Sequence, residues 1–220
     1  MRKILSLSLV LICSGLLATA QIKKGAVLLG GQIAFADADA ESNNTQPNQQ
    51  QSQKNNSAFF KISVGKAIKE NTVVGINAGY GNNKNENFNN NTLVSSSDFK
   101  QYSVGIFYRQ YKKIGGDFYF FGEGGADYIG STQKDTNFPG SNLITRKGSG
   151  VQLSLTPGIS YQVLKKLQLE ILIPDIAALQ YNTLKSTGQN YTAKQNQFSF
   201  NTSLSSSPLN SLGIGFRLVL

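Results

Sequence analysis

The stretch that decides the fold is Val151-Gln152-Leu153-Ser154-Leu155-Thr156-Pro157-Gly158-Ile159-Ser160-Tyr161-Gln162-Val163. Its odd positions hold apolar or aromatic residues and proline, and its even positions hold polar or small residues. Successive side chains of a β-strand point to opposite faces of the sheet. The alternation therefore predicts a strand with one apolar and one polar face.

The same period of two recurs along most of the chain, and no segment has the pattern of a helix. We expect eight strands, within residues 25–36, 58–68, 72–81, 99–111, 117–130, 148–163, 167–181 and 197–220. Pro157 and Pro174 lack a ladder donor, so bulges are expected there, with the seventh strand stopping near Ile173 and resuming after Ala178. The last region is either one long kinked strand or a strand preceded by a short element at 197–204. An even strand number favours the kinked strand.

The connections between these strands alternate in length. Short turns lie at 69–71, 112–116 and 164–166, and long polar stretches lie at 37–57, 82–98, 131–147 and 182–196. This alternation predicts an eight-stranded antiparallel up-and-down transmembrane β-barrel, with long extracellular loops and short periplasmic turns. A soluble sandwich has no reason to sort its loops by length. Disordered linkers are the alternative explanation of the Asn/Gln-rich tracts.

Aromatic residues on the apolar parity gather near the strand ends. One row, beside the long connections, is Phe35, Phe60, Tyr80, Tyr102 and Tyr128; the other, beside the short turns or the C-terminus, is Tyr108, Phe118, Tyr161 and Phe216. Two aromatic girdles around an aliphatic band are typical of a lipid-facing barrel wall. The alternative turns these faces inward, as the core of a soluble barrel or sandwich.

The opposite parity carries six charged residues: Lys61, Arg109, Arg217, Glu123, Asp127 and Glu170. In an eight-stranded barrel this face is the interior, which side chains fill. Burying a charge without a partner costs several kcal/mol. Because cations and anions balance, the pattern predicts a structural ion-pair network in the lumen. A role in ligand binding or conduction is the alternative.

The composition excludes several classes of site. The chain has no His and one Cys, which excludes a Ser-His-Asp triad, a His-ligated or thiolate metal site and an intrachain disulfide. We expect no catalytic residue, metal or cofactor; a Ser-Lys dyad, or a carboxylate pair such as Glu123 with Asp127, is the enzymatic alternative. The net charge of +9 is spread over turns and loops without a binding motif, so no nucleic-acid partner is expected.

The N-terminus has the pattern of an export signal. Arg2 and Lys3 precede an apolar run at 4–17, and Ala18-Thr19-Ala20 fits a cleavage site. We expect a signal peptide at 1–20, cleaved after Ala20, and one barrel domain at 21–220. Cys13 would leave with the signal. The alternative is a membrane anchor, but the apolar run is short and no basic stop-transfer pattern follows it.

Three stretches carry a resemblance to a known family: 121–125 (FGEGG), 155–161 (LTPGISY) and 212–218 (LGIGFRL). Over residues 25–220 the chain resembles the outer-membrane β-barrel family common in Gram-negative bacteria of the Bacteroidota type, and looks like the small OmpA/OmpX-like or OmpW-like barrels. That family has no shared catalytic residues. Its members usually end in an aromatic residue that the insertion machinery recognises, whereas this chain ends in Leu220, with Phe216 four residues earlier.

Pattern and resemblance together predict a monomeric, non-enzymatic barrel of the cell outer membrane, with a lumen filled by side chains. Its expected partners are outer-membrane lipid and lipopolysaccharide, the insertion machinery, and a surface ligand that the sequence does not identify. Envelope integrity or surface interaction through the polar loops is the expected role. The alternative is a narrow channel or a transporter for small or apolar solutes.

Overall fold

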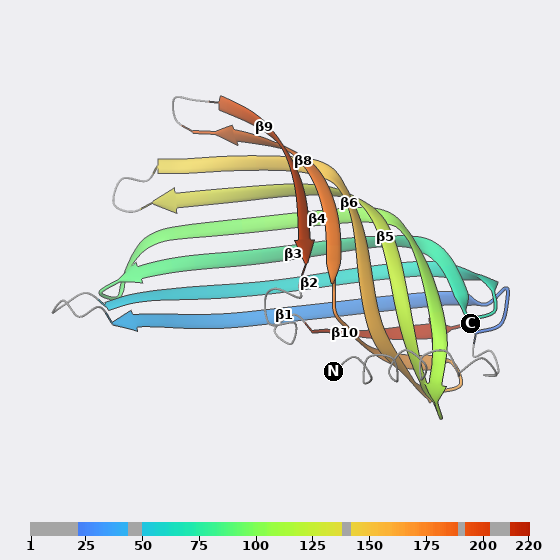
Figure 1. Ribbon diagram of the computed structural model, residues 1–220. Helices are drawn as coiled ribbons and strands as arrows, with labels where there is room; N and C mark the ends of the chain where they lie inside the picture. Colours follow the sequence, from blue (N-terminus) through green and yellow to red (C-terminus); the bar gives the residue numbers. More distant parts are fainter. Residues whose placement is uncertain (1–21, 44–49, 138–141, 189–191, 203–211) are drawn as a thin grey trace, which may run out of the picture.

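The structure is a computed structural model that describes residues 22–43, 50–137, 142–188, 192–202 and 212–220. The expected signal peptide, with Cys13, lies outside these residues. The described residues form one antiparallel sheet (Figure 1). Its strands are β1 (Val27–Asn43), β2 (Gln50–Lys69), β3 (Thr72–Asn89), β4 (Thr92–Gly115), β5 (Phe118–Asn137), β6 (Asn142–Leu164), β7 (Leu167–Leu172), β8 (Ala177–Thr187), β9 (Thr192–Thr202) and β10 (Gly213–Val219).

Eight of these strands close into a ring, in the order β1-β2-β3-β4-β5-β6-β7-β10, with β10 returning to β1. The closing pair sets Leu29 of β1 opposite Leu218 of β10. Closure gives every strand a neighbour on both sides, so the ring has no free edge. The eight-stranded antiparallel barrel expected from the sequence is confirmed. Within the described residues, no helix is long and apolar enough to cross a bilayer.

The seventh strand is interrupted where the sequence has Pro174. Strand β7 ends at Leu172 and β8 begins at Ala177. Strand β6 changes partner at the same height: its lower part pairs with β7 from Gly158, and its upper part pairs with β8 up to Leu155. Proline donates no ladder hydrogen bond, which explains why the wall breaks at this height.

The expectation of one kinked strand over 197–220 is wrong. Strand β9 pairs with β8 alone, whereas β10 pairs with β7 and β1. The chain leaves the ring between β7 and β8, where Asp175 has a positive φ of 48°. The β8–β9 hairpin then extends the wall beside the upper part of β6, and β10 alone closes the ring.

Most of the polar connections are not irregular loops, because the strands continue through them. Strands β3 and β4, for example, pair out to Asn89 and Thr92. The two residues between these positions, Asn90 and Asn91, have φ values of 49° and 60°. Two positive-φ residues, often Asn or Gly, make the type I′ hairpin turn. Cross-strand pairing also satisfies the backbone groups that a long loop would leave to water.

We call these extensions the outer sheet. It comprises the parts of the strands beyond the aromatic row of Phe35, Phe60, Tyr80, Tyr102 and Tyr128: residues 36–43, 50–59, 81–89, 92–101, 129–137, 143–150, 181–187 and 192–197. In Figure 1 the outer sheet runs away from the closed ring, with β1 at one margin and β9 at the other. At the opposite end, short turns join β2 to β3, β4 to β5 and β6 to β7, as expected.

Candidate functional site

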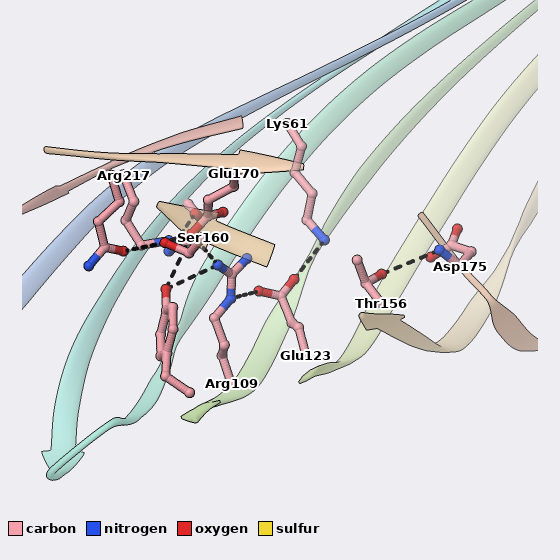
Figure 2. A network of polar contacts seen from close by, with 11 residues as sticks. Lys61, Arg109, Glu123, Thr156, Ser160, Glu170, Asp175 and Arg217 are labelled. Carbon is pink, nitrogen blue, oxygen red and sulfur yellow. Dashed lines mark hydrogen bonds and ion pairs between the residues drawn. The ribbon is translucent and has the colours of Figure 1, made fainter. Parts of the chain in front are cut away.

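The inward parity of the ring builds a charged layer across the lumen (Figure 2). Arg109 donates from Nε to Glu123 Oε2 at 2.7 Å and from Nη1 to Glu170 Oε1 at 2.7 Å. Arg217 donates from Nε to the same Glu170 oxygen at 3.0 Å. Lys61 Nζ lies 3.6 Å from Glu123 Oε1. Five charged side chains from distant parts of the sequence thus form one continuous network.

Strand register explains how these side chains meet. Arg109 of β4 lies directly opposite Glu123 of β5. Arg217 of β10 lies opposite Gly30 of β1, and a Cβ at Gly30 would come within 3.0 Å of the Arg217 guanidinium carbon. The missing side chain at Gly30 therefore leaves room for Arg217 to turn toward Glu170. Arg109, Arg217 and Glu170 are among the most deeply buried side chains in the described part of the molecule.

Below this layer lies an apolar floor. Its buried members include Tyr111, Tyr119 and Phe121, all on inward positions of β4 and β5. The Arg109 guanidinium lies 4.0 Å above the centre of the Phe121 ring, and its Nη1 donates to the Tyr111 hydroxyl at 3.1 Å. Cations are attracted to aromatic faces, so the floor also stabilises the arginine. Together, floor and charged layer fill this end of the lumen.

The sixth predicted lumen residue, Asp127, stands apart from the network. It is buried, and no ion pair joins it to another residue that the structure describes. Its strand neighbour is Gly105, which has no side chain, so the Asp127 carboxylate lies over Gly105 toward Asn77 on the next strand. Asp127 and Asn77 both keep buried side-chain atoms without a partner among the described residues. The suggested carboxylate pair is therefore not an isolated dyad, because Glu123 is bound to Arg109 and Lys61.

Above the charged layer, the link between β7 and β8 crosses toward β6. The backbone N–H of Asp175 donates to Thr156 Oγ1 at 3.3 Å (Figure 2). Gln152 Nε2 donates to the Asp175 carboxylate at 3.0 Å. Gln152 and Thr156 both lie on the inward parity of β6. The interruption at Pro174 therefore sets a carboxylate on the lumen side of the wall.

The outer sheet is lined by amides and hydroxyls that bond across strands. Asn83 donates to Asn55 at 3.0 Å, and Asn87 donates to the Ser95 hydroxyl at 2.9 Å. An amide can donate and accept at the same time, so these ladders leave groups that can contact a polar ligand. The outer sheet thus presents a hydrogen-bonding surface on a regular scaffold.

The predicted girdle aromatics all lie on the outward face and are exposed on the isolated chain: Phe35, Phe60, Tyr80, Tyr102, Tyr108, Phe118, Tyr128, Tyr161 and Phe216. The aliphatic residues between the two rows, such as Ile106 and Leu153, are exposed as well. A continuous exposed apolar band around a closed ring matches a wall that faces lipid.

Sequence reasoning missed the apolar floor and the aromatics of the upper lumen, Phe59 and Phe99. The signal was present, because Phe107, Arg109 and Tyr111 share one parity on β4 and all point inward. The bonds around Asp175 had no comparable signal, because they depend on where the interrupted chain turns. No group of residues able to hold a metal ion exists among those the structure describes.

Comparison with known proteins adds the family. Residues 5–205 match the family model described as outer membrane protein beta-barrel domain. OprG from Pseudomonas aeruginosa has a TM-score of 0.51 at 12% identity, with 92% of this chain and 99% of OprG covered. Neisserial surface protein A has a TM-score of 0.42 at 18% identity, with 89% and 99% covered. The protease OmpT from Escherichia coli has a TM-score of 0.40 at 9% identity, with 94% and 97% covered.

No curated protein matches the sequence. At these identities the likeness to solved structures is one of fold alone. The family match, however, spans nearly the whole chain, and the closed ring has the exposed apolar band and filled interior of a small barrel. The chain therefore belongs to the outer membrane protein beta-barrel domain family and lies in the outer membrane.

Proposed function

We propose that this protein is a non-enzymatic, monomeric barrel whose lumen does not conduct and whose outer sheet contacts polar material at the cell surface. The observation that carries the proposal is the filled end of the lumen. Arg109, Glu170 and Arg217 are fully buried there, above an apolar floor that includes Phe121. A solute would have to break buried ion pairs to pass, and breaking one such pair costs about 3–5 kcal/mol.

The contact surface would be the outer sheet, because its strands extend a polar, amide-rich face beyond the aromatic row. Function is often carried by the parts of a rigid scaffold that project from it. Envelope integrity is compatible with the same surface if its ligand belongs to the cell's own lipopolysaccharide. Recognition of β10 by the insertion machinery is part of the proposal.

The test measures permeability and ligand retention on the same purified protein. We expect no increase in osmotic swelling with small sugars and no conductance in planar bilayers. We also expect retention on immobilised lipopolysaccharide, which a variant lacking residues 42–54 and 84–96 reduces. Swelling that rises with the amount of protein would contradict the closed lumen. Equal retention of the trimmed variant would contradict the role of the outer sheet.

A transport role is the second candidate, because the wall is incomplete above the closed ring. From Phe35 onward, β1 pairs with β2 alone among the described residues, and β9 pairs with β8 alone. Phe35 and Phe198, at the two margins, have exposed fractions of 73% and 71%. Such an opening would let an apolar solute pass between the upper lumen and the bilayer. Faster transfer of an apolar dye into proteoliposomes than into protein-free liposomes would support this candidate.

A further inference from the structure

The upper lumen contains a cavity of about 320 Å³ that neither the charged layer nor the apolar floor occupies. Strands β1 to β4 line it on one side, with Ala34 and Phe35 at the β1 margin, and the Pro174–Asp175 link lines it on the other. Ligand pockets commonly have volumes of about 300–1,000 Å³, so this cavity suits a small molecule.

Two phenyl rings form the apolar part of the cavity. Phe59 of β2 lies over β3, where a Cβ at Gly79 would come within 3.3 Å of its ring and a Cβ at Gly81 within 3.2 Å. The two glycines therefore let the ring lie against the β3 backbone. Phe99 lies on β4, directly opposite Asn83 of β3. The Phe59 ring is thus held against the sheet, and Phe99 adds a second ring to the cavity lining.

Polar groups alternate with these rings. Gln101 lies opposite Gly81, in the same row as Phe59, and its side chain makes no hydrogen bond with any residue that the structure describes. Asn83 uses its Nδ2 to bond Asn55, and its carbonyl oxygen is an acceptor. Across the cavity, Gln152 bonds one oxygen of the Asp175 carboxylate. No lysine or arginine is among the described residues that line the cavity, which disfavours an anionic ligand.

We propose that this cavity binds one neutral sugar ring. A pyranose has an apolar face of C–H groups and an edge of hydroxyls that both donate and accept hydrogen bonds. The phenyl rings match the face, and Gln101, Asn83 and Asp175 match the edge. The inference deepens the proposed function, on which it rests, by naming the class of group that the polar surface would recognise.

The absence of tryptophan from the chain provides the reporter, because Phe99→Trp adds a single tryptophan to the cavity wall, which can be excited selectively at the red edge of its absorption, where tyrosine does not absorb. The full-length protein carrying Phe99→Trp, in detergent, is titrated with glucose, galactose and N-acetylglucosamine. We expect a saturable change in fluorescence with at least one sugar. Adding Gln101→Ala should weaken the affinity about tenfold, because it removes a hydrogen-bonding group from the wall. The matched control is Gln110→Ala, the same change on the outward face at the other end of β4, which should leave the affinity unchanged.

Saturation-transfer NMR on the unmodified protein gives a second measurement, which does not depend on the tryptophan. Binding of choline but of no sugar would overturn the proposal and identify a cation site made by the rings and Asp175. The absence of binding of any sugar or of choline, both by fluorescence and by NMR, would also overturn the proposal. Absent sugar binding with intact retention on lipopolysaccharide would reject this inference alone. Sugar binding in a protein that conducts would reject only the closed lumen.

Discussion

Glu170 is the residue on which the lumen network converges. Its Oε1 accepts hydrogen bonds from Arg109, from Arg217 and, at 3.3 Å, from the Tyr111 hydroxyl. These partners come from β4 and β10, while Glu170 comes from β7. One carboxylate therefore ties the strand that closes the ring to the opposite wall. The parity of the sequence indicated that these charges share the lumen, but not which ones meet.

Glu170→Gln should destabilise the barrel by about 3–5 kcal/mol, because it leaves two buried guanidinium groups without their shared anion. The measurement is the urea midpoint of unfolding in detergent, followed by the mobility shift between unboiled and boiled samples. The control is Glu86→Gln, which removes an ion pair with Lys84 at the exposed outer sheet and should cost at most about 1 kcal/mol. Equal midpoints for the two variants would show that the Glu170 contacts contribute no more to stability than a surface ion pair.

Leu153→Arg should block insertion. Leu153 lies on the outward face between the aromatic rows and is 57% exposed on the isolated chain. An arginine at the bilayer midplane costs about 2–4 kcal/mol, and the cost falls toward the interface. Ser149→Arg, on the same face of β6 but in the outer sheet, is the control and should insert normally. Outer-membrane recovery after fractionation measures both. Normal assembly of Leu153→Arg would mean that the apolar face does not contact lipid.

At the scale of single elements, the strands are longer than a bilayer requires. A spanning strand needs about 9–11 residues, whereas β4 has 24 and β6 has 23. The surplus forms the outer sheet, whose paired backbone makes it a continuation of the wall. The interruption at Pro174 breaks this continuity once, between β7 and β8.

Deleting residues 42–54 should leave the barrel folded. Ala38 pairs with Asn55, so the deletion leaves Asp39 to Glu41 as a three-residue hairpin loop, a common length. The ring pairs of β1 and β2, from Val27 with Lys66 upward, are untouched. The boiling-dependent mobility shift checks the result. Deleting Gly213–Val219 instead removes the closing strand and should abolish the shift. Loss of the shift in the first deletion would make the hairpin tip part of the folding unit.

The period of two was enough to predict the ring, because the bilayer and the filled lumen sort side chains by parity along every strand. It predicted less above the aromatic row, where both faces are polar and alternation no longer distinguishes them. The Asn-rich stretch at 82–98 therefore suggested a loop, although its residues pair along β3 and β4 and turn at Asn90 and Asn91. The separation of β9 from β10 follows because β9 pairs with β8 alone, whereas β10 pairs with β7 and β1. The sequence left both arrangements open, because pairing of β10 with β1 joins the two ends of the chain.

At the scale of the whole molecule, the barrel is closed at one end and open along one side of the other. The ring is sealed by β7 and β10, but above it β1 and β9 are the margins of an open sheet. The sealed ring supports a non-conducting lumen. The open margins between β1 and β9 provide the lateral opening that a transport role would need. Whether the margins meet in the membrane decides between the two.

A pair of cysteines measures this directly, because we expect the mature chain to have no cysteine of its own. Asp37→Cys with Phe198→Cys, across the opening, should stay reduced under mild oxidant, since a disulfide needs Cα atoms within about 7 Å. The control pair is Asp37→Cys with Asn56→Cys, on directly opposed positions of β1 and β2, which should cross-link. Electrophoresis without reductant reports both. Rapid cross-linking across the opening would show that the wall closes and would remove the lateral path.

The position of Arg217 has a consequence for how the protein is made. Strand β10 supplies both the last two seams of the ring and the second arginine that Glu170 binds. A chain whose synthesis stops before β10 keeps its earlier strands. However, β1 and β7 then each have an unpaired edge, and Glu170 lacks the positive charge of Arg217. We expect that docking of the final strand closes both seams and supplies this counter-charge in one step. We expect this coupling to act as a proofreading step for chain completeness, so that prematurely ended copies stay open and are cleared by envelope proteases, while finished copies become resistant at once.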